Sequence, residues 1–355
     1  MNEIKSLYEK LKDEPETKGE TYRLVILSHD EADDPNETGI LIRKRAEELG
    51  LDVLLGEFIG AYTKKVDGKR YIYSFKVDEK GNVIIPDPKQ GAVYDEPFEI
   101  DQKNTLIMVR GLGTSGLTGN RSWTDIIRIL EYEGFFVINS TNCHAICSDK
   151  WMNQIVFERN NFRIPKTIRI NHPEGAEEAV KELDIDYPLI LKTATGSRGI
   201  GVMWIESYKA LSGIVQLLYR QDEWIDILLQ EYIKTDYDVR VIVCAGKVVG
   251  VMKRPVVEGD YRSNVSQGSE PETHELTKLE ESESIRAAEA VEGMVVGVDF
   301  IPAKNREKES PYFIEVNSTP GLIGIEKTLE KNYSITTEIL KRFFDKGLWK
   351  KSDNE

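Results

Sequence analysis

The sequence predicts an α/β (α+β) protein of two or three domains. Short apolar runs suited to strands alternate with segments whose apolar residues recur at the helical period. The length of 355 residues is enough for more than one domain. With 40% hydrophobic and 30% charged residues, the chain has the composition of an ordinary globular protein, which excludes extensive disorder.

The first part of the chain predicts a strand, a helix and a strand, followed by a hairpin. Leu24 to Leu27 and Asp52 to Phe58 are apolar runs, and Glu37 to Leu49 has helical spacing. Residues 71–85 alternate around a turn at 78–82, which predicts the hairpin. The predicted domain, residues 1–145 with the hairpin segment inserted at about 61–104, is completed by a strand at 105–109, a helix over 123–130 and a strand at 135–138.

The rest of the chain predicts two further units, residues 146–229 and 230–347. The first unit has expected helix N-caps at Ser148 and Ser207, with helices over 151–156, 176–183 and 211–218 and strands at 189–192 and 202–205. The second unit has a hairpin of 239–244 and 248–252, strands at 295–301 and 312–316, and a final helix over 335–343. Polar residues 258–273 predict a long loop of the kind that often closes over a site.

The charge balance limits the partners. The chain has 61 acidic and 47 basic residues, a net charge of −14, which argues against nucleic acid. No apolar stretch approaches the roughly 20 residues of a membrane helix, and the N-terminal residues lack the apolar region of a secretion signal. Three cysteines are too few for a disulfide framework. We therefore expect a cytoplasmic protein without a nucleic-acid or membrane partner.

Two motifs are weak on inspection. Residues 111–116, GLGTSG, match the glycine pattern of a dinucleotide loop, but residues 117–121 intervene before the helix and the next strand lacks the expected acidic end. We interpret them as a glycine-rich loop at a cleft, with a nicotinamide oxidoreductase as the outside alternative. Cys143, His144 and Cys147 have no second ligand pair elsewhere, which favours a buried junction over a zinc site.

Two segments could bind a nucleotide. Residues 192–201, KTATGSRGIG, join two predicted strands through a lysine, small polar residues and three glycines, so that backbone N–H groups could approach a polyphosphate. A plain hairpin turn explains this segment equally well. Gln230, Glu231 and Tyr232 end an apolar strand with polar groups and a ring that could hold a purine. An ordinary strand end is the alternative.

The most informative set is Asp299, Glu315 and Asn317. Glu315 and Asn317 share a face at the two-residue strand period, and Asp299 lies on the neighbouring predicted strand. Apolar strands rarely bury two carboxylates without a partner, and Mg²⁺ prefers hard oxygen ligands. The set therefore predicts a divalent metal site or, as the alternative, a structural hydrogen-bond network.

Arginines flank the long polar loop. Lys253-Arg254 and Arg262-Ser263-Asn264 lie at its two ends, where guanidinium groups could clamp a phosphoryl group or a substrate carboxylate. Taken singly, they could equally be solvated surface charges.

Taken in order, these segments resemble an ATP-grasp ligase of the RimK-like branch, whose named member adds glutamate to a ribosomal protein. The resemblance spans roughly residues 110 to 344 and rests on TGSRGIG, QEYI, DVR, KRP, EGDYRSN, GVDF and FIEVNSTPGLIGIEK. It implies an ATP-grasp fold behind an enlarged N-terminal α/β (pre-ATP-grasp) domain. The N-terminal domain is longer than the RimK pattern, chiefly at residues 61–104, which puts the identity of the acceptor in doubt.

The resemblance also implies roles for individual residues. It makes Asp299, Glu315 and Asn317 the ligands of magnesium, with two ions expected and Mn²⁺ as a possible substitute. The implied ATP-binding residues are Lys150, Lys192, Ser197, Arg198, Gly199, Gly201, Glu231, Tyr232, Ile233, Asp238, Arg262, Ser263 and Asn264. The implied catalytic residues are Arg254, Arg262 and Asn264, and the implied substrate contacts are Arg110, Arg240, Arg254 and Ser318.

The implied reaction joins a carboxylate to an amine at the expense of ATP. A substrate carboxylate takes the γ-phosphoryl group, and an amine then displaces phosphate from the acyl phosphate. We expect an amino acid, glutamate by analogy, to be added to a peptide, a protein C-terminus or a small carboxylate, by a chain that can form homo-oligomers. The alternatives are an ATP-grasp ligase of a small metabolite or coenzyme and a non-catalytic ATP-binding regulatory module.

Overall fold

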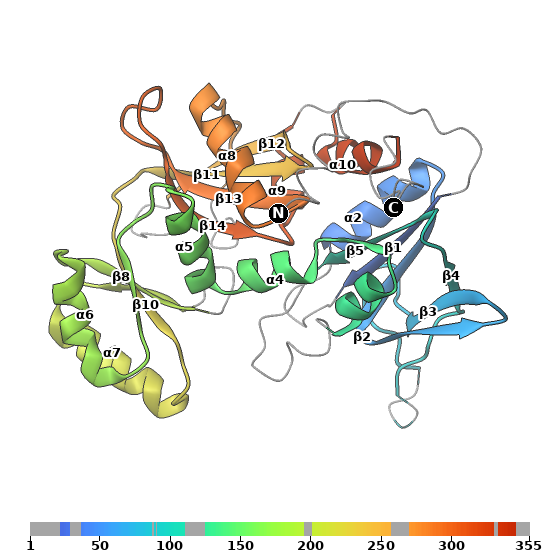
Figure 1. Cartoon of the computed structure of the whole chain (residues 1–355), viewed down its shortest axis with the longest axis horizontal. Helices are drawn as coiled ribbons and strands as arrows, with labels where there is room; N and C mark the ends of the chain where they lie inside the picture. Colours follow the sequence, from blue (N-terminus) through green and yellow to red (C-terminus); the bar gives the residue numbers. More distant parts are fainter. Residues whose placement is uncertain are drawn as a thin grey trace.

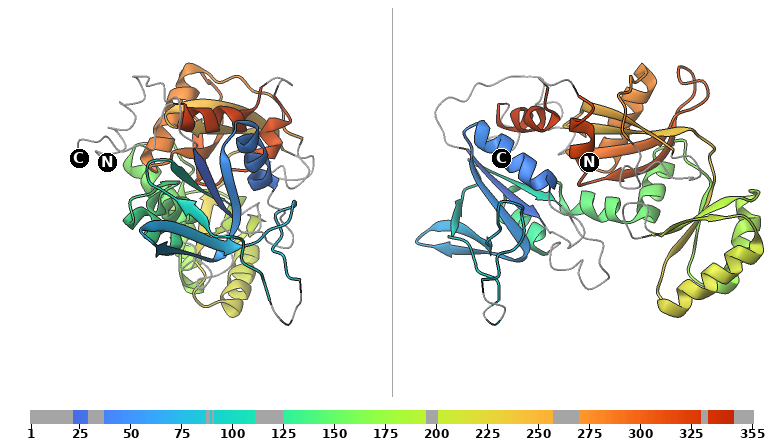
Figure 2. Two further views of the ribbon diagram at one scale, coloured as in Figure 1. Left: turned by 90° about the vertical axis from the view of Figure 1, so that its right-hand side faces the viewer. Right: turned by 180° about the vertical axis from the view of Figure 1, so that it is seen from behind.

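The computed structural model describes residues 22–28, 37–86, 89, 91–110, 125–194, 201–256, 270–329 and 333–345. Three sheets organise them, with strand orders β4-β3-β2-β1-β5-β6, β7-β10-β8-β9 and β12-β11-β13-β14 (Figure 1). The first and second sheets lie at opposite ends of the molecule in both face-on views (Figure 2). The predicted mixed α/β class is confirmed.

The first sheet has a parallel centre and an antiparallel edge. Strand β1 (Arg23–Ser28) pairs in parallel with β2 (Asp52–Val66) and β5 (Thr105–Arg110), and β5 pairs in parallel with β6 (Phe136–Ile138). Helix α2 (Glu37–Glu48) packs on one face through Ile42 and Ala46. A helix ending at residue 132 packs on the other face. The strands β1 and β5 are buried throughout their apolar residues, as expected for a sheet covered on both faces.

The predicted turn at 78–82 is present, and a longer hairpin that the sequence analysis did not predict precedes it. Strand β2 continues to Val66 and turns at Asp67-Gly68 into β3 (Lys69–Phe75), and β4 (Phe98–Ile100) adds beside β3. Asp67 and Gly68 have positive φ angles of 48° and 82°, which suits an Asp-Gly turn. The predicted turn at 78–82 closes only an isolated bridge between Val77 and Val83. The Asp-Gly pair was the stronger hairpin signal.

Two helices connect the first sheet to the rest of the chain. Helix α4 (Thr141–Ser148), which the sequence analysis did not predict, is N-capped by Ser140. The expectation that Ser148 caps the next helix was wrong, because Asp149 caps α5 (Lys150–Arg159) by accepting hydrogen bonds from the N–H groups of Trp151 and Met152. Ser148 is the last residue of α4 and is not in a position to cap α5.

The second sheet is covered by helices on one face. Its strands are β7 (Thr167–Ile170), β8 (Leu189–Thr193), β9 (Val202–Ile205) and β10 (Ile227–Glu231). Helices α6 (Ala176–Leu183) and α7 (Tyr208–Gln221) pack on it through an apolar cluster that includes Leu189, Leu191 and Leu211. Ser207 caps α7, as predicted.

The third sheet is covered by helices on one face and, over part of its length, on the other. Its strands are β11 (Tyr237–Cys244), β12 (Lys247–Pro255), β13 (Val295–Ile301) and β14 (Tyr312–Asn317). Helix α8 (Lys278–Ala290), which was not predicted, begins with a capping box of Thr277 and Glu280 and packs with α5 on the first of these faces. The chain then forms α9 (Ile323–Glu326) and α10 (Ile335–Phe344). The described residues contain no helix long and apolar enough to cross a membrane.

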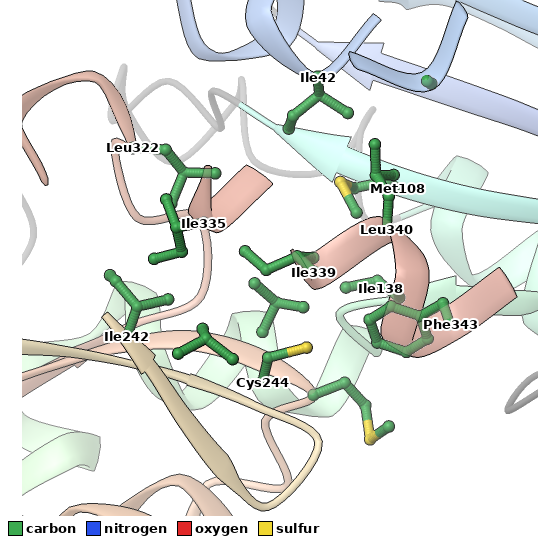
Figure 3. Packing of buried hydrophobic residues seen from close by; sticks show 14 of the residues in the cluster. Ile42, Met108, Ile138, Ile242, Cys244, Leu322, Ile335, Ile339, Leu340 and Phe343 are labelled. Carbon is green, nitrogen blue, oxygen red and sulfur yellow. The ribbon is translucent and has the colours of Figure 1, made fainter. Parts of the chain in front are cut away.

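One apolar core joins the first and third sheets. Figure 3 shows Ile42, Met108 and Ile138 of the N-terminal region packing around α10, with Ile242 and Cys244 of β11 on the other side. Helix α10 contributes Ile335, Ile339, Leu340 and Phe343, all nearly inaccessible to solvent. Because these residues share one cluster, the C-terminal helix fixes the N-terminal sheet against the third sheet.

Asn139 forms the polar part of the same junction. Its side chain is 1% exposed and makes four hydrogen bonds. Nδ2 donates to the carbonyl groups of Val295 and Ser318, each at 2.7 Å. Oδ1 accepts from the N–H groups of Met294 at 2.7 Å and Val295 at 3.1 Å. The amide therefore gives hydrogen-bond partners to buried backbone groups at the start of β13 and just after β14.

We predict that Asn139→Ala lowers the free energy of unfolding by about 3 kcal/mol, because it leaves buried backbone groups without partners. Urea unfolding measures the change. Asn142→Ala is the matched control, since the Asn142 amide makes a single exposed hydrogen bond to Glu292. Equal stability of the two variants would show that the Asn139 network contributes little.

Candidate active site

The face of the third sheet opposite α8 carries charged residues beyond the part that α10 covers. On β11, Val239, Val241 and Val243 point into the apolar cluster under α8. The alternate positions Asp238 and Arg240 therefore point to the opposite face. The cross-strand register places Arg254 beside Asp238, and Asp299 beside both Arg240 and Glu315. Strand alternation and register together gather these charges on one surface.

Asp299 forms ion pairs with two arginines on this surface. It is 3% exposed, and Arg240 binds it in a bidentate manner, with Nε to Oδ1 at 2.7 Å and Nη2 to Oδ2 at 2.6 Å. Arg254, also 3% exposed, donates to Oδ2 at 3.0 Å. The two guanidinium groups lower the pKa of Asp299 against the opposing effect of burial, so the carboxylate is charged at neutral pH.

Arg254 is held from a second side by Asp238. Its Nε and Nη2 donate to the two carboxylate oxygens of Asp238 at 2.6 and 2.7 Å. The nearby carboxylates of Asp299 and Asp238 raise the pKa of Arg254 despite its burial. Asp238 was predicted as a nucleotide contact, and the structure shows its carboxylate engaged with Arg254. Its role toward a nucleotide stays a prediction.

The predicted metal ligands lie together. Asp299 is opposite Glu315 in the β13–β14 register, and Gly297 is opposite Asn317. The Asn317 amide donates to Oε1 of Glu315 at 3.2 Å. Two carboxylates and an amide oxygen form a hard donor set of the type that Mg²⁺ prefers, so the residues fit the ion. An ion at Asp299 would share that carboxylate with Arg240 and Arg254. No group of three His, Cys, Asp or Glu side chains suited to a metal occurs in the described part of the chain.

The two predicted phosphate lysines face the same surface from the second sheet and from α5. Lys150 is the first residue of α5, and its N–H group donates to the Ala194 carbonyl at the end of β8. Lys192 lies on β8 and donates to Oε1 of Gln230 at 2.7 Å. Burial lowers the pKa of both lysines, to about 8 for Lys192, and the carboxylate of Glu315 opposes this shift in each case. Glu315 is therefore within electrostatic range of both lysines.

The predicted purine-binding segment is built at the end of β10. The backbone N–H of Glu231 donates to the Lys166 carbonyl at 2.8 Å, and the Glu231 carboxylate accepts from the Lys166 N–H at 3.1 Å. The ring of Tyr232 packs edge-on against Trp204 at 4.6 Å between centroids. Ile233 follows directly and is partly exposed. An aromatic surface thus lies at the end of β10, on the same sheet as Lys192.

The predicted substrate residues Arg110 and Ser318 lie near each other. Arg110 ends β5, is 5% exposed, and donates through Nη2 to the carbonyl groups of Thr319 and Pro320. Ser318 Oγ is 2.8 Å from Nδ1 of His144. Burial lowers the pKa of Arg110 to about 10, and burial with the nearby Arg110 charge lowers the pKa of His144 to about 3. His144 is therefore neutral, and no carboxylate of the described residues pairs with Arg110.

Of the residues predicted in the glycine-rich loop, the structure describes Gly201. It precedes β9 with a φ of 78°, and a Cβ there would lie 2.7 Å from the Thr193 hydroxyl, which explains a glycine at that position. The residues of the glycine motif at 111–116, together with Ser197, Arg198, Gly199, Arg262, Ser263 and Asn264, lie outside the described residues.

Sequence reasoning missed the supporting residues. Gln230 accepts from Lys192 and donates to Thr167 Oγ1 at 2.8 Å, and so fixes the lysine against β7. Asn153 of α5 accepts from the Val316 N–H at 3.0 Å and orients β14 between its two predicted ligands. The sequence pattern singles out Gln230 and Glu231 at the strand end, but only the cross-strand register shows that Gln230 accepts a hydrogen bond from Lys192.

The comparisons with known proteins define the class of protein. The model of the RimK-like ATP-grasp domain matches residues 147–342, more than half of the chain. The chain therefore belongs to the RimK-like ATP-grasp family and is an ATP-grasp carbon–nitrogen ligase, which confirms the resemblance noted in the sequence. Binding of ATP and magnesium is typical of this family.

Individual relatives narrow the comparison. The chain is 32% identical over 226 residues to a probable alpha-L-glutamate ligase of Vibrio atlanticus (strain LGP32), covering 63% of this chain and 72% of that protein. The fold resembles the ATP-grasp ligase PsnB complexed with minimal precursor, with a TM-score of 0.61, 16% identity and coverage of 92% and 99%. It also resembles PsnB complexed with a phosphomimetic precursor variant, Mg and ADP, with a TM-score of 0.60, 16% identity and coverage of 92% and 98%. These structures confirm the ATP-grasp fold.

We predict that Arg254→Leu destabilises the protein by about 3–5 kcal/mol, because Asp238 and Asp299 would each lose a guanidinium partner. Urea unfolding measures the loss. Arg169→Leu removes an equally short ion pair, to Asp226 at 2.6 Å, at a site where both side chains are more than 30% exposed. That control should cost less than about 1 kcal/mol. A similar small loss in both variants would contradict the role given to the buried network.

Proposed function

We propose that this protein is an ATP-dependent ligase that joins an amino acid, glutamate by analogy, to the carboxylate of a peptide or protein through an acyl phosphate. The observation that supports the proposal most directly is that Lys150, bonded to the end of β8 through Ala194, and Lys192 on β8 both lie within electrostatic range of Glu315 on β14. Cationic groups from one side and hard oxygen donors from the other are what a metal-bound triphosphate requires. The domain division at residues 145/146 and 229/230 is part of the proposal.

The second sheet would bind the nucleotide. Glu231, Tyr232 and Ile233 would offer backbone groups and an aromatic surface for the base. Lys192 lies opposite Leu228, three strand positions from Glu231, and contacts Gln230. Lys150 would approach the phosphates from the N-terminal end of α5, where the helix dipole also favours an anion. The predicted contacts of residues 197–199 and 262–264 belong to the same proposal.

The third sheet would hold the metal. Asp299, Glu315 and Asn317 would be the ligands of one or two Mg²⁺ ions, for which Mn²⁺ could substitute. Bound magnesium would supply charge neutralisation for the transferring phosphoryl group. The PsnB complex with Mg and ADP supports a nucleotide and metal in this fold.

The arginines would handle the carboxylate substrate. Arg240 and Arg254 border Asp299 and could bind the carboxylate and the charge that develops as its oxygen attacks the γ-phosphate. Arg110 and Ser318 would contact substrate from the N-terminal region. Because phosphoryl transfer depends on positioning and charge neutralisation, no nucleophilic side chain is needed.

The acceptor is proposed from the relatives. The Vibrio protein is named a probable alpha-L-glutamate ligase, and the PsnB structures contain a precursor. These names support glutamate as the donated amino acid and a polypeptide as the acceptor. The test is ADP release from MgATP across single amino acids, with and without peptides, combined with mass detection of the product. A product heavier by one amino-acid residue would support the proposal. Absence of ADP release with every amino acid and peptide tested would contradict it.

We predict that Glu315→Gln abolishes this ADP release while the protein stays folded, because the amide keeps the volume and loses the charge that a metal requires. Asp299→Asn should abolish it too, but it also leaves Arg240 and Arg254 without a full counter-charge. Unfolding curves separate the two effects. Turnover of Glu315→Gln close to that of the unchanged protein would refute the metal assignment.

We predict that MgADP affinity falls as the pH rises through about 8, where buried Lys192 loses its proton in the nucleotide-free protein. The protonated form binds phosphate, so affinity is fully present below this pH and declines above it, by up to about tenfold per pH unit. Fluorescence titration of a labelled ADP over this range measures it. Lys192→Arg keeps its charge and should flatten the profile. The same decline in that variant would assign the titration to another group.

A further inference from the structure

Helix α5 carries three polar residues on one of its sides. Lys150 is its first residue, and Asn153 and Gln154 follow three and four positions later. Residues at these spacings lie next to one another on a helix. Asn153 is 1% exposed and Gln154 is 4% exposed, although neither amide takes part in the chemistry proposed above. A buried amide is costly unless it is hydrogen-bonded, so two neighbouring ones indicate partners on the element packed against them.

The partners of Asn153 lie mainly on β14. This strand is the outermost of the four in the third sheet, so one side of its backbone is not paired with another described strand. The Val316 N–H donates to Oδ1 of Asn153 at 3.0 Å. Nδ2 of Asn153 donates to the Val316 carbonyl at 3.4 Å and to the Ile146 carbonyl at 3.2 Å. The amide thus pairs with both backbone groups of Val316, as a neighbouring strand would.

Gln154 extends this contact to the residue before Glu315. Its Nε2 donates to the Ile314 carbonyl at 3.3 Å. The backbone on both sides of Glu315 is therefore bound by α5. None of these bonds uses the side chain of Glu315 or Asn317. The two amides hold the strand that carries the metal-ligand candidates and leave the ligands themselves to other partners.

The same helix is bound to the second sheet. The Lys150 N–H donates to the Ala194 carbonyl, directly after β8, at 3.0 Å. Oε1 of Gln154 accepts from the hydroxyl of Thr167 on β7 at 3.4 Å. In Figure 1, α5 lies between β14 and the sheet that contains β8 and β10. The charges of Lys150 and Glu315 interact across this contact. Helix α5 is thus the element that joins the predicted phosphate lysines to the predicted metal ligands.

We propose that Asn153 and Gln154 are positioning residues, which hold β14 at a fixed distance from Lys150 so that metal and nucleotide phosphates bind cooperatively. The inference rests on the proposed function, in which Lys150 binds phosphate and Glu315 and Asn317 bind the metal. A metal that joins a phosphate to protein ligands binds best where both already stand at the right separation. Without the two amides, this separation would have to be ordered at the moment of binding, at a cost in affinity.

The test compares the affinity of the full chain for labelled ADP in excess Mg²⁺ and in EDTA, by fluorescence titration. The ratio of the two dissociation constants measures how much the metal adds to nucleotide binding. We expect Asn153→Leu to lower this ratio by about tenfold, an effect typical of losing a residue that supports a metal ligand. Affinity in EDTA should stay close to that of the unchanged protein, because Lys150 and Lys192 are retained.

Two further variants complete the test. Gln154→Met keeps the volume of the side chain and removes the longer bond to β14, so the ratio should fall by less than in Asn153→Leu. If Asn153→Leu does not fold, Gln154→Met decides alone. Asn160→Leu is the matched control, because Asn160 lies at the other end of α5, where its exposed amide donates to the Val156 carbonyl of the same helix at 2.8 Å. This variant should leave the ratio unchanged.

The ratio distinguishes positioning from a purely structural role. A partly unfolded variant binds ADP less well in Mg²⁺ and in EDTA by the same factor, so its ratio does not change. An unchanged ratio in both Asn153→Leu and Gln154→Met would therefore overturn the proposal, and so would an equal fall in Asn160→Leu. Failure of the unchanged protein to bind ADP would refute the nucleotide site itself, and the inference with it, which is a different result from a measured ratio that the variants leave intact.

Discussion

The buried carboxylate of Asp299 is the interaction on which the charged face of the third sheet depends. Arg240 and Arg254 both bind it, and Arg254 is a fully buried guanidinium group. A buried cation without a counter-charge costs several kcal/mol. The carboxylate therefore allows both arginines to lie on strands whose other face is apolar. Donors that ion pairs already hold in place need little reorganisation when an anion arrives.

The charge of Lys192 on the second sheet is compensated less completely than that of Arg254. Gln230 gives Lys192 a hydrogen bond but no charge, and burial lowers the pKa of the lysine to about 8. Arg110 likewise binds backbone carbonyls and no described carboxylate. A shifted lysine and an arginine without a counter-ion mark positions at which the fold carries a cost that an anionic ligand would offset. Both positions belong to the residues proposed to bind the phosphates and the substrate carboxylate.

Local sequence patterns predicted several residues of the charged face. They failed where the pairing of strands distant in the sequence determines which side chains meet. Glu315 and Asn317 share a face because strands alternate, which needs no knowledge of the fold. The choice of Asp238 and Asp299 as partners of Arg254 follows from the register of β11 with β12 and β13, which sequence patterns leave open. Ser148 and Asp149 are both good helix caps, and the unpredicted α4 decided between them. The Asp67-Gly68 turn was not predicted because the second half of β2 is polar and lacks the apolar pattern of a strand.

The N-terminal region is fixed relative to the third sheet by interactions that also hold the segment after β14. Asn139 binds the backbone of Val295 and Ser318, and Arg110 binds the carbonyl groups that follow Ser318. These contacts reach the segment directly after the metal-ligand candidate Asn317. Because the amide, the guanidinium and the α10 core act on the same few residues, movement of the N-terminal sheet would move the end of β14. The position of the N-terminal sheet and the geometry at the end of β14 are therefore coupled.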